Sequence, residues 1–280
     1  GTASISIAKA DATVAVVGYT GVYDGDPHGA TGSATGIKGE DLSGLLDLGA
    51  SFTNVPGGTA SWSFAGNANY NPASGTASIV ITPASQTISF GPLSNRMYGD
   101  APFTVSATGG ASGNPVTFTA AGNCTVAGNV VTLTGKGSCT ITASQAGSLN
   151  YAAAMPVAQS FSIAGWKLRG FYQPVDMGGV LNTVKGGSTV PMKFEIFADT
   201  TELTAVSAIK SLAATKISCS SSAAIDDIEL TATGGTSLRY DATSGQFIYN
   251  WQTPKGAGVC YRVTMTAQDG STISADFKMK

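Results

Sequence analysis

The sequence has little charge and no long apolar run. Charged residues make up 11% of its 280 residues and the net charge is -2, whereas an average soluble domain is roughly 25% charged. The 15 basic residues form no cluster, which argues against a nucleic-acid partner and against an anionic membrane surface. No segment reaches the roughly 20 apolar residues of a membrane-spanning helix, and the first residues lack the pattern of a secretion signal. We therefore expect no nucleic-acid binding and no membrane insertion.

A single histidine leaves little room for nucleophilic or acid–base catalysis. A Ser-His-Asp or Cys-His system could be built only around His28, which lies in a turn beside Asp26 and Pro27. A hydrogen-bonded or solvent-facing turn histidine is the simpler interpretation. The 36 glycines are spread through hairpins and do not join a strand to a helix, so no phosphate-binding loop is indicated. We predict that the chain is not an enzyme and needs no cofactor.

The four cysteines lack the short C-x-x-C spacing of zinc and thiol-redox sites. They fall instead as two local pairs, Cys124 with Cys139 and Cys219 with Cys260, each inside one predicted module. We interpret both pairs as disulfides, with free buried thiols as the alternative. Disulfides persist in oxidising compartments, so we expect the protein to be secreted or exposed on a cell surface, in an extracellular location.

The sequence does contain one strand pattern that occurs three times. At 77–88 an alternating apolar strand is interrupted by Pro83 and a second strand follows at once, which is typical of one module closing and the next beginning. The same arrangement occurs at 3–14 and at 159–166. We call these stretches seams, and three of them predict a string of modules.

The seams divide the chain into three modules after a short leading strand. We predict an all-β fold of three tandem β-sandwich (Ig-like) modules in an extended array, because each has the size of a small β domain. Modules 1, 2 and 3 are residues 11–83, 84–164 and 165–280. Residues 1–10 match the strand that closes module 1, so they are the orphan closing strand of a preceding module or a strand donated to a neighbour. The residues of this intermolecular strand are Ala3, Ser4, Ile5, Ser6 and Ile7.

Modules 1 and 2 share landmarks in the same order. Tyr-Gly-Asp-Ala-Pro at 98–102 takes the place of Tyr-Asp-Gly-Asp-Pro at 23–27. Ser-Leu-Asn-Tyr at 148–151 takes the place of Asn-Ala-Asn-Tyr at 67–70. Two landmarks in register indicate an internal repeat.

Module 3 has a different pattern. Residues 186–197 predict a strong strand, in which Pro191 indicates a sheet edge or a strand start. Further strands are expected at 247–251, 260–267 and 274–280, with a hairpin turn at Asp269-Gly270.

These landmarks resemble known bacterial domains. The Tyr-Asp-Gly-Asp-Pro opening and Gly-Asn-Ala-Asn-Tyr closing of module 1 resemble Ig-like repeats of the MBG/YDG type, and module 2 looks like a close relative. Module 3 resembles PxKF domains through Pro191-Met192-Lys193-Phe194, and it fits them also at Cys219, Cys260-Tyr261 and Ala275-Asp276-Phe277. The resemblance implies spacer modules of large secreted or surface-anchored bacterial proteins such as adhesins, and it carries over no catalytic residue.

Ligand sites have weaker candidates. Asp24 and Asp26 offer hard oxygen ligands to calcium, although the six to eight or so oxygens that calcium takes are not visible at a recognised spacing. Turn formation is the alternative for both. Tyr172 and Trp251 are candidates for a glycan contact, with core packing as the alternative. Lys193 is a candidate for an isopeptide crosslink, whose partner the sequence does not place.

We therefore expect a structural, non-catalytic role as a stalk, fibre or adhesin segment. Its partners would be neighbouring modules or copies of itself, with a surface protein or a glycan as further candidates. Seams that contain proline and few flexible residues should limit bending between modules. The alternatives are a self-assembling filament subunit, in which residues 1–10 complete a neighbour's sheet, and a glycan-binding head in module 3.

Overall fold

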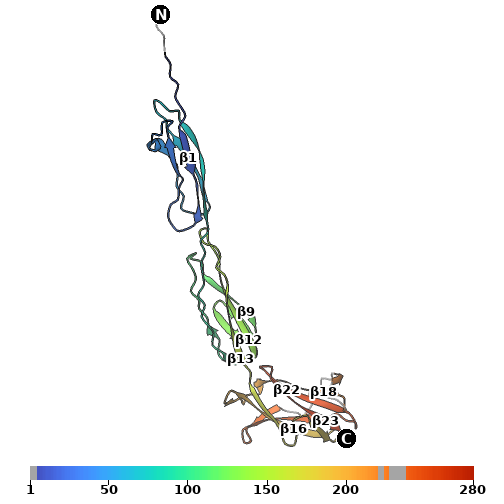
Figure 1. Cartoon of the computed structure of the whole chain (residues 1–280). Coiled ribbons are helices and arrows are strands. Elements are labelled where there is room, and N and C mark those ends of the chain that lie inside the picture. Colours follow the sequence, from blue (N-terminus) through green and yellow to red (C-terminus); the bar gives the residue numbers. More distant parts are fainter. Residues whose placement is uncertain (1–4, 220–223, 227–237) are drawn as a thin grey trace. The chain divides into compact units, whose positions relative to one another are not determined.

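The computed structural model describes residues 5–219 and 238–280 and the backbone of 224–226, and Figure 1 follows its strands along the chain. The helical elements of this part of the chain are two short 3-10 turns, η1 (Ser43–Leu45) and η2 (Val206–Ala208). The predicted all-β class is confirmed. No helix among the described residues is long and apolar enough to span a membrane.

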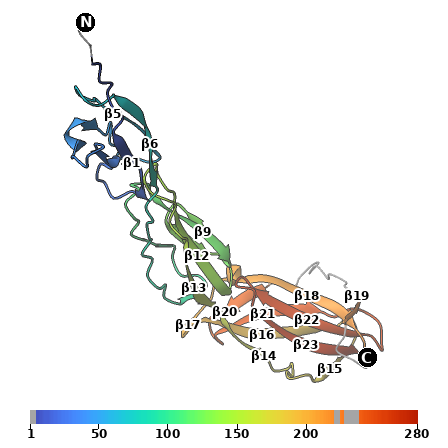
Figure 2. The ribbon, with the colours of Figure 1, turned by 45° about the horizontal axis from the view of Figure 1, so that its top comes forward.

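Module 1 consists of two small sheets. Its strands are β1 (Thr13–Val17), β2 (Tyr19–Val22), β3 (Thr31–Thr35), β4 (Leu46–Asp47), β5 (Gly57–Phe64) and β6 (Ala73–Thr82). β1 pairs with β3, and the other sheet has the order β2-β6-β5-β4, in which β5 and β6 lie side by side (Figure 2). The alternation of β6 buries Ile79 and Ile81, each 1% exposed, and leaves Val80 outside.

Module 2 follows a related plan. Its strands are β7 (Arg96–Met97), β8 (Phe103–Thr104), β9 (Val116–Gly122), β10 (Cys124–Ala127), β11 (Val130–Leu133), β12 (Gly137–Gln145) and β13 (Val157–Ala164). The sheet orders are β10-β11-β8 and β7-β13-β12-β9. A disulfide between Cys124 and Cys139 joins the start of β10 to β12, as the sequence pairing predicts.

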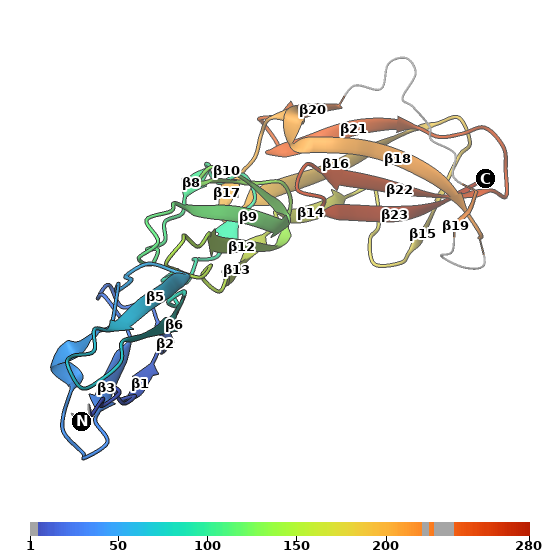
Figure 3. The ribbon, with the colours of Figure 1, turned by 90° about the horizontal axis from the view of Figure 1, so that it is seen from above.

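Module 3 is a larger sandwich with two five-stranded sheets (Figure 3). Its strands are β14 (Lys167–Tyr172), β15 (Leu181–Val184), β16 (Thr189–Ala198), β17 (Thr201–Glu202), β18 (Ile209–Ile217), β19 (Ala224–Asp226), β20 (Leu238–Asp241), β21 (Gln246–Gln252), β22 (Cys260–Ala267) and β23 (Thr272–Met279). One sheet has the order β14-β16-β21-β20, with β17 on β16, and the other has the order β15-β23-β22-β18-β19. Met192, Phe194 and Phe277 belong to their shared core. The second disulfide joins Cys219 to Cys260.

Pro191 lies inside β16, and the pairing around it explains why it is tolerated there. On one side it pairs with Asn250 of β21. On the other side the ladder with β14 ends where Tyr172 pairs with Lys193, so Pro191 has one neighbouring strand where residues further along β16 have two. The predicted sheet edge is therefore correct for one side of this position, which is where proline is accepted.

One pairing recurs in all three modules. An early strand lies parallel to the last strand of the same module, namely β2 to β6, β7 to β13 and β15 to β23. The last strand of modules 1 and 2 is also the first strand of the following seam. Each seam thus begins within a sheet of the preceding module, in β6 of module 1 or in β13 of module 2.

By compactness the chain separates into two units, and each is described by itself. Unit 1 contains residues 1–90, 107–117 and 143–157, and unit 2 contains residues 91–106, 118–142 and 158–280. The division passes through module 2, whereas each sheet stays within one predicted module. The stretch 77–88, named seam 1 from here on, lies wholly in unit 1. The stretch 159–166, named seam 2, lies wholly in unit 2.

Candidate functional site at the seams

Seam 1 passes from one module to the next without a free linker. β6 ends at Thr82, and directly after Pro83 the backbone of Ala84 is already paired in module 2. The N–H of Ala84 donates to the carbonyl of Asn150 at 2.9 Å, and the N–H of Ala152 donates to the carbonyl of Ala84 at 2.8 Å. The one intervening residue is a proline, whose φ is fixed by its ring.

The side chain of Asn150 holds a loop of module 1 at seam 1. Its Oδ1 accepts a hydrogen bond from the N–H of Val55 at 3.0 Å, and its Nδ2 donates to Oδ1 of Asn54 at 2.7 Å. The loop is a tight turn in which the N–H of Gly57 donates to the carbonyl of Asn54 at 2.8 Å. One amide of module 2 therefore acts as both donor and acceptor toward module 1.

An aromatic pair adds an apolar contact to seam 1. The rings of Tyr23 and Tyr151 meet edge to face, with centroids 5.4 Å apart and an interplanar angle of 77°. The N–H of Tyr23 donates to the carbonyl of Thr82 at 2.8 Å, which ties this tyrosine to the end of β6. Such a pair contributes about 0.5–1.5 kcal/mol beyond the area that it buries.

Seam 2 is centred on Trp166, which follows β13 and Gly165. The backbone N–H of Trp166 donates to Oδ2 of Asp269 in module 3 at 2.6 Å. Its indole Nε1 donates to the carbonyl of Tyr98 in module 2 at 3.0 Å. The rings of Trp166 and Tyr98 also meet edge to face, with centroids 5.3 Å apart. Trp166 is therefore bonded to both modules.

Asp269 is the buried charge that organises seam 2, and it is only 3% exposed. Besides Trp166, its carboxylate accepts hydrogen bonds from the N–H of Ser271 at 2.9 Å and from Oγ of Ser271 at 2.6 Å. Lys136 of module 2 completes the contact, because its Nζ donates to Oγ of Ser271 at 3.1 Å. Both carboxylate oxygens thus have donors, which offsets the cost of burying the charge.

Gly165 keeps these groups close together. A Cβ at this position would lie 2.7 Å from Cδ of Lys136 and 2.8 Å from Oδ2 of Asp269. Any larger residue would have to displace the lysine or the carboxylate. The absence of a side chain at this position is thus a requirement of seam 2.

The two seams share one plan. The N–H of Tyr98 donates to the carbonyl of Ala164 at 2.9 Å, as the N–H of Tyr23 does to Thr82. Each tyrosine directly follows the strand that lies parallel to its seam strand, and each contacts an aromatic ring of the next module. From the sequence, both tyrosines are landmarks of the internal repeat, and no role at a seam was predicted for them. Their place one residue after the early strand is the signal that could have indicated the seam role.

The predicted calcium ligands form a turn in the structure. Oδ1 of Asp24 accepts hydrogen bonds from the N–H of Asp26 and from Nε2 of His28, both at 2.9 Å. The first bond, followed by the second, holds the pKa of Asp24 below its ordinary value. Across residues 5–219 and 238–280 no three His, Cys, Asp or Glu side chains are grouped so that they could hold a metal ion. The geometry supports the turn-forming role that we weighed against calcium binding.

Of the two residues predicted to contact a glycan, Trp251 is inaccessible in the structure and Tyr172 is not. Trp251 is 3% exposed and packs against Phe277 with ring centroids 4.8 Å apart, in the core of module 3. A sugar cannot reach this ring, so the predicted contact at Trp251 is wrong. Tyr172 is half-buried, and its hydroxyl donates to Oε2 of Glu195 at 2.6 Å. Burial and this bond raise the pKa of Tyr172 to about 12, and its glycan role stays a prediction.

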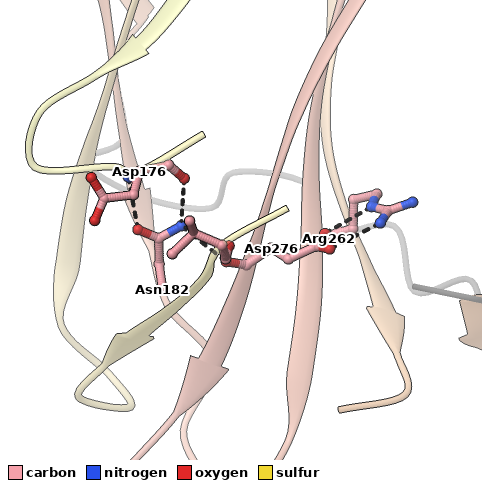
Figure 4. Close-up of polar contacts among 5 residues, drawn as sticks. Asp176, Asn182, Arg262 and Asp276 are labelled. Atoms are coloured by element: carbon pink, nitrogen blue, oxygen red, sulfur yellow. Dashed lines mark hydrogen bonds and ion pairs between the residues drawn. The ribbon is translucent and has the colours of Figure 1, made fainter. Parts of the chain in front are cut away.

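A polar network fixes the loop before β15 to β23 (Figure 4). Oδ1 of Asn182 accepts from the N–H of Asp176 at 2.8 Å, and its Nδ2 donates to the carbonyls of Asp176 and Asp276 at 2.9 and 3.1 Å. Arg262 donates to both carboxylate oxygens of Asp276 at 2.7 and 2.9 Å, which raises the pKa of Arg262. A cleft of about 370 Å³ lies beside Asn182 and Asp176. Because these polar groups bond to one another, the network holds the loop in place.

Comparison with known proteins finds similarity at the level of solved structures. No family model matches the chain, and no curated protein matches it. A fragment of titin, domains I67–I69 in an E-to-A variant, is 9% identical, with 96% of this chain and 97% of that chain covered and a TM-score of 0.30. The Yersinia pseudotuberculosis adhesin InvE is 13% identical, with 70% and 58% covered and a TM-score of 0.28. Domains 4–9 of the surface layer protein SbsC are 14% identical, with 91% and 42% covered and a TM-score of 0.24. At these TM-scores the similarity carries no argument about function.

Proposed function

We propose that the chain is a structural, non-catalytic segment of an extracellular bacterial protein, namely part of a stalk, fibre or adhesin built of Ig-like modules. The observation that carries this proposal is that side chains bond across both seams. Asn150 bonds to Val55 at seam 1, and Trp166 bonds to Tyr98 and Asp269 at seam 2. Modules that served only as independent binding units would need no such bonds between them.

These contacts give a mechanism for resisting bending. Opening seam 1 breaks two hydrogen bonds of Asn150 and separates Tyr23 from Tyr151. A hydrogen bond contributes about 0.5–1.5 kcal/mol and the aromatic pair a similar amount, so opening costs roughly 2–4 kcal/mol. An open state at that free energy has a population of about 0.1–3%. The closed seam is then the state in which the protein works.

The disulfides support an extracellular location. Cys124 and Cys139 close a loop with a sequence separation of 15, and Cys219 and Cys260 close one of 41. In the chain-entropy model each such bond stabilises its module by about 3–4 kcal/mol. That stabilisation is available only in an oxidising compartment, such as the exterior of a bacterial cell.

Small-angle X-ray scattering tests the proposal. We expect the parent chain to scatter as an extended array, and a variant with both Asn150→Ala and Asp269→Ala to scatter as a more flexible one. Asp199→Asn is the matched control, because it removes an exposed ion pair with Lys167 at 3.6 Å and keeps a residue type that tolerates the positive φ of 55° at this position. A compact globule for the parent, or equal flexibility in parent and seam variant, would contradict the proposal.

A self-assembling filament subunit is the second candidate. It is favoured by Ile5 and Ile7, which are 89% and 90% exposed although they belong to a strand-like sequence. If the filament reading is right, deletion of residues 1–10 should abolish polymers seen by negative-stain microscopy. Unchanged assembly of the deleted chain would exclude it.

A further inference from the structure

The start of module 1 is built like the start of module 2. The N–H of Ala10 donates to the carbonyl of Asn69 at 2.9 Å, and the N–H of Asn71 donates to the carbonyl of Ala10 at 2.9 Å. Ala84 makes the same pair of bonds in module 2, and both alanines form a parallel bridge. Ala10 and Asn69 are therefore the structural equivalents of Ala84 and Asn150.

The residues before these two alanines differ in burial. Counted back from each alanine, Ile5 and Ile7 correspond to Ile79 and Ile81. Ile79 and Ile81 are each 1% exposed in the core of module 1, whereas Ile5 and Ile7 are 89% and 90% exposed. In the part of the chain that the structure describes, residues 5–9 belong to no strand. A strand sequence with two isoleucines on one face thus has no sheet to cover it.

The equivalent of Asn150 is also uncovered. Asn150 is half-buried where it bonds to the loop of module 1, whereas Asn69 is exposed. Asn69 borders a cleft of about 430 Å³ that Ile7 and Ile37 also line, and Ile37 is 72% exposed. An amide, a cleft and an apolar strand-like sequence therefore lie together at the start of module 1. Their counterparts at the start of module 2 are covered by module 1 at seam 1.

We infer that this end of module 1 binds a further Ig-like module of the module 1 type, one that needs a closing strand. Residues 5–8 take the place of β6 in that module, parallel to its β2 equivalent and antiparallel to its β5 equivalent. Ile5 and Ile7 enter its core, and Asn69 bonds to the loop that corresponds to Asn54 and Val55. The inference rests on the proposed function, because it predicts that a contact like seam 1 also joins module 1 to a further Ig-like module.

A chain with a copy of residues 11–76 placed directly before Ala3 supplies this partner. Residues 3–8 then stand where 77–82 stand in module 1. We expect the copy to fold and the amides of Ile5 and Ile7 to exchange with solvent at least about a hundredfold more slowly than in the parent chain. Unchanged exchange of these amides, or a copy that stays open to protease, would overturn the inference.

Matched substitutions in the extended chain show whether the slower exchange arises because residues 5–8 enter the sheet of the added copy or merely because residues were added. Ile5→Asp combined with Ile7→Asp should remove the protection, because charges would enter the core. Ser6→Asp should keep it, because Ser6 corresponds to Val80, which lies outside the core at 38% exposure. If the protection survives the double substitution, or is lost with Ser6→Asp, then Ile5 and Ile7 do not enter the core of the partner module and the inference is wrong. The scattering test at seams 1 and 2 is independent of both results, so the proposed function can stand if this inference fails.

Discussion

Seams 1 and 2 hold modules together with different chemistry. At seam 1 the crosslink is the neutral amide of Asn150, and at seam 2 it is the buried carboxylate of Asp269 with Lys136 nearby. A neutral hydrogen bond contributes about 1 kcal/mol net, whereas removing one partner of a buried charged network leaves polar groups unpaired at higher cost. Seam 2 should therefore be the more sensitive to substitution. Both seams contain the tyrosine of the repeat, Tyr23 or Tyr98, but the polar side chain beside it differs, because it is Asn150 at seam 1 and Asp269 at seam 2.

The largest effect is expected for Asp269→Ala. It leaves the N–H groups of Trp166 and Ser271 without their acceptor, so the free energy of unfolding should fall by about 2–4 kcal/mol. Hydrogen exchange at the amides of β22 and β23 in module 3 would measure this change. Asp199→Asn, which breaks an exposed ion pair with Lys167 and keeps a residue type that tolerates the positive φ of 55° there, should cost less than about 0.5 kcal/mol. Equal losses for the two variants would show that the buried contacts of Asp269 add no stability at seam 2.

A smaller effect is expected for Asn150→Ala at seam 1. Two neutral hydrogen bonds are lost, so the free energy of opening at the Val55 amide should fall by about 1–2 kcal/mol, as measured by hydrogen exchange. Asn69→Ala is the matched control within the same repeat, because its side chain is exposed. A comparable change at Val55 in the control variant would show that the Asn150 contact does not hold the loop.

The aromatic pairs should contribute about equally to the two seams. Tyr23→Leu keeps an apolar side chain but loses the edge-to-face contact with Tyr151, and Tyr98→Leu does the same to Trp166. Each should destabilise its seam by about 0.5–1.5 kcal/mol, as measured by denaturation of the single variants. A much larger loss of stability at one seam would show that its tyrosine contributes more than the edge-to-face contact that the two seams share.

The smallest effect is expected from Asp24, whose folded-state pKa lies below the ordinary value of 3.8 because of the Asp26 N–H and then His28. A lowered pKa means that the ionised group stabilises the fold above its ordinary pKa. This stabilisation is lost as the pH falls through the lower, folded-state value. Asp24→Asn should therefore make module 1 slightly less sensitive to pH below 3.8. Acid titration followed by the NMR signals of module 1 would measure it, and an unchanged acid midpoint would contradict it.

The seams could be predicted from the sequence, but their contacts could not. The repeated strand-proline-strand pattern lies within a few consecutive residues, so the pattern at 77–88 could be recognised without knowledge of the tertiary structure. Asn150 and Asn54 are 96 residues apart, and Trp166 and Asp269 are 103 apart. No local pattern indicates which distant turn reaches a seam. The hairpin turn at Asp269 was predicted from Asp-Gly alone, and its role in seam 2 depends on the tertiary fold.

The error at Trp251 has a related cause. β21 lies between β16 and β20, and it has buried residues at consecutive positions from Phe247 to Tyr249. A strand with apolar residues on both faces gives no period-2 contrast, so the buried face cannot be assigned from the pattern. For β6 the contrast is clear, and the burial of Ile79 and Ile81 confirms the alternating strand that was predicted at the start of 77–88.

The parallel pairing of early and last strands determines how each module carries tension. When a chain is pulled from both ends, two such strands slide along each other, so their ladder bonds are loaded together. A hairpin pair loaded at its open end separates one bond at a time. The ladder of β2 and β6 runs from Tyr19 to Val22, whereas that of β7 and β13 contains only the pairs of Arg96 and Met97. Module 2 should therefore yield first under force, and its disulfide would then limit the extension by keeping the segment between Cys124 and Cys139 closed.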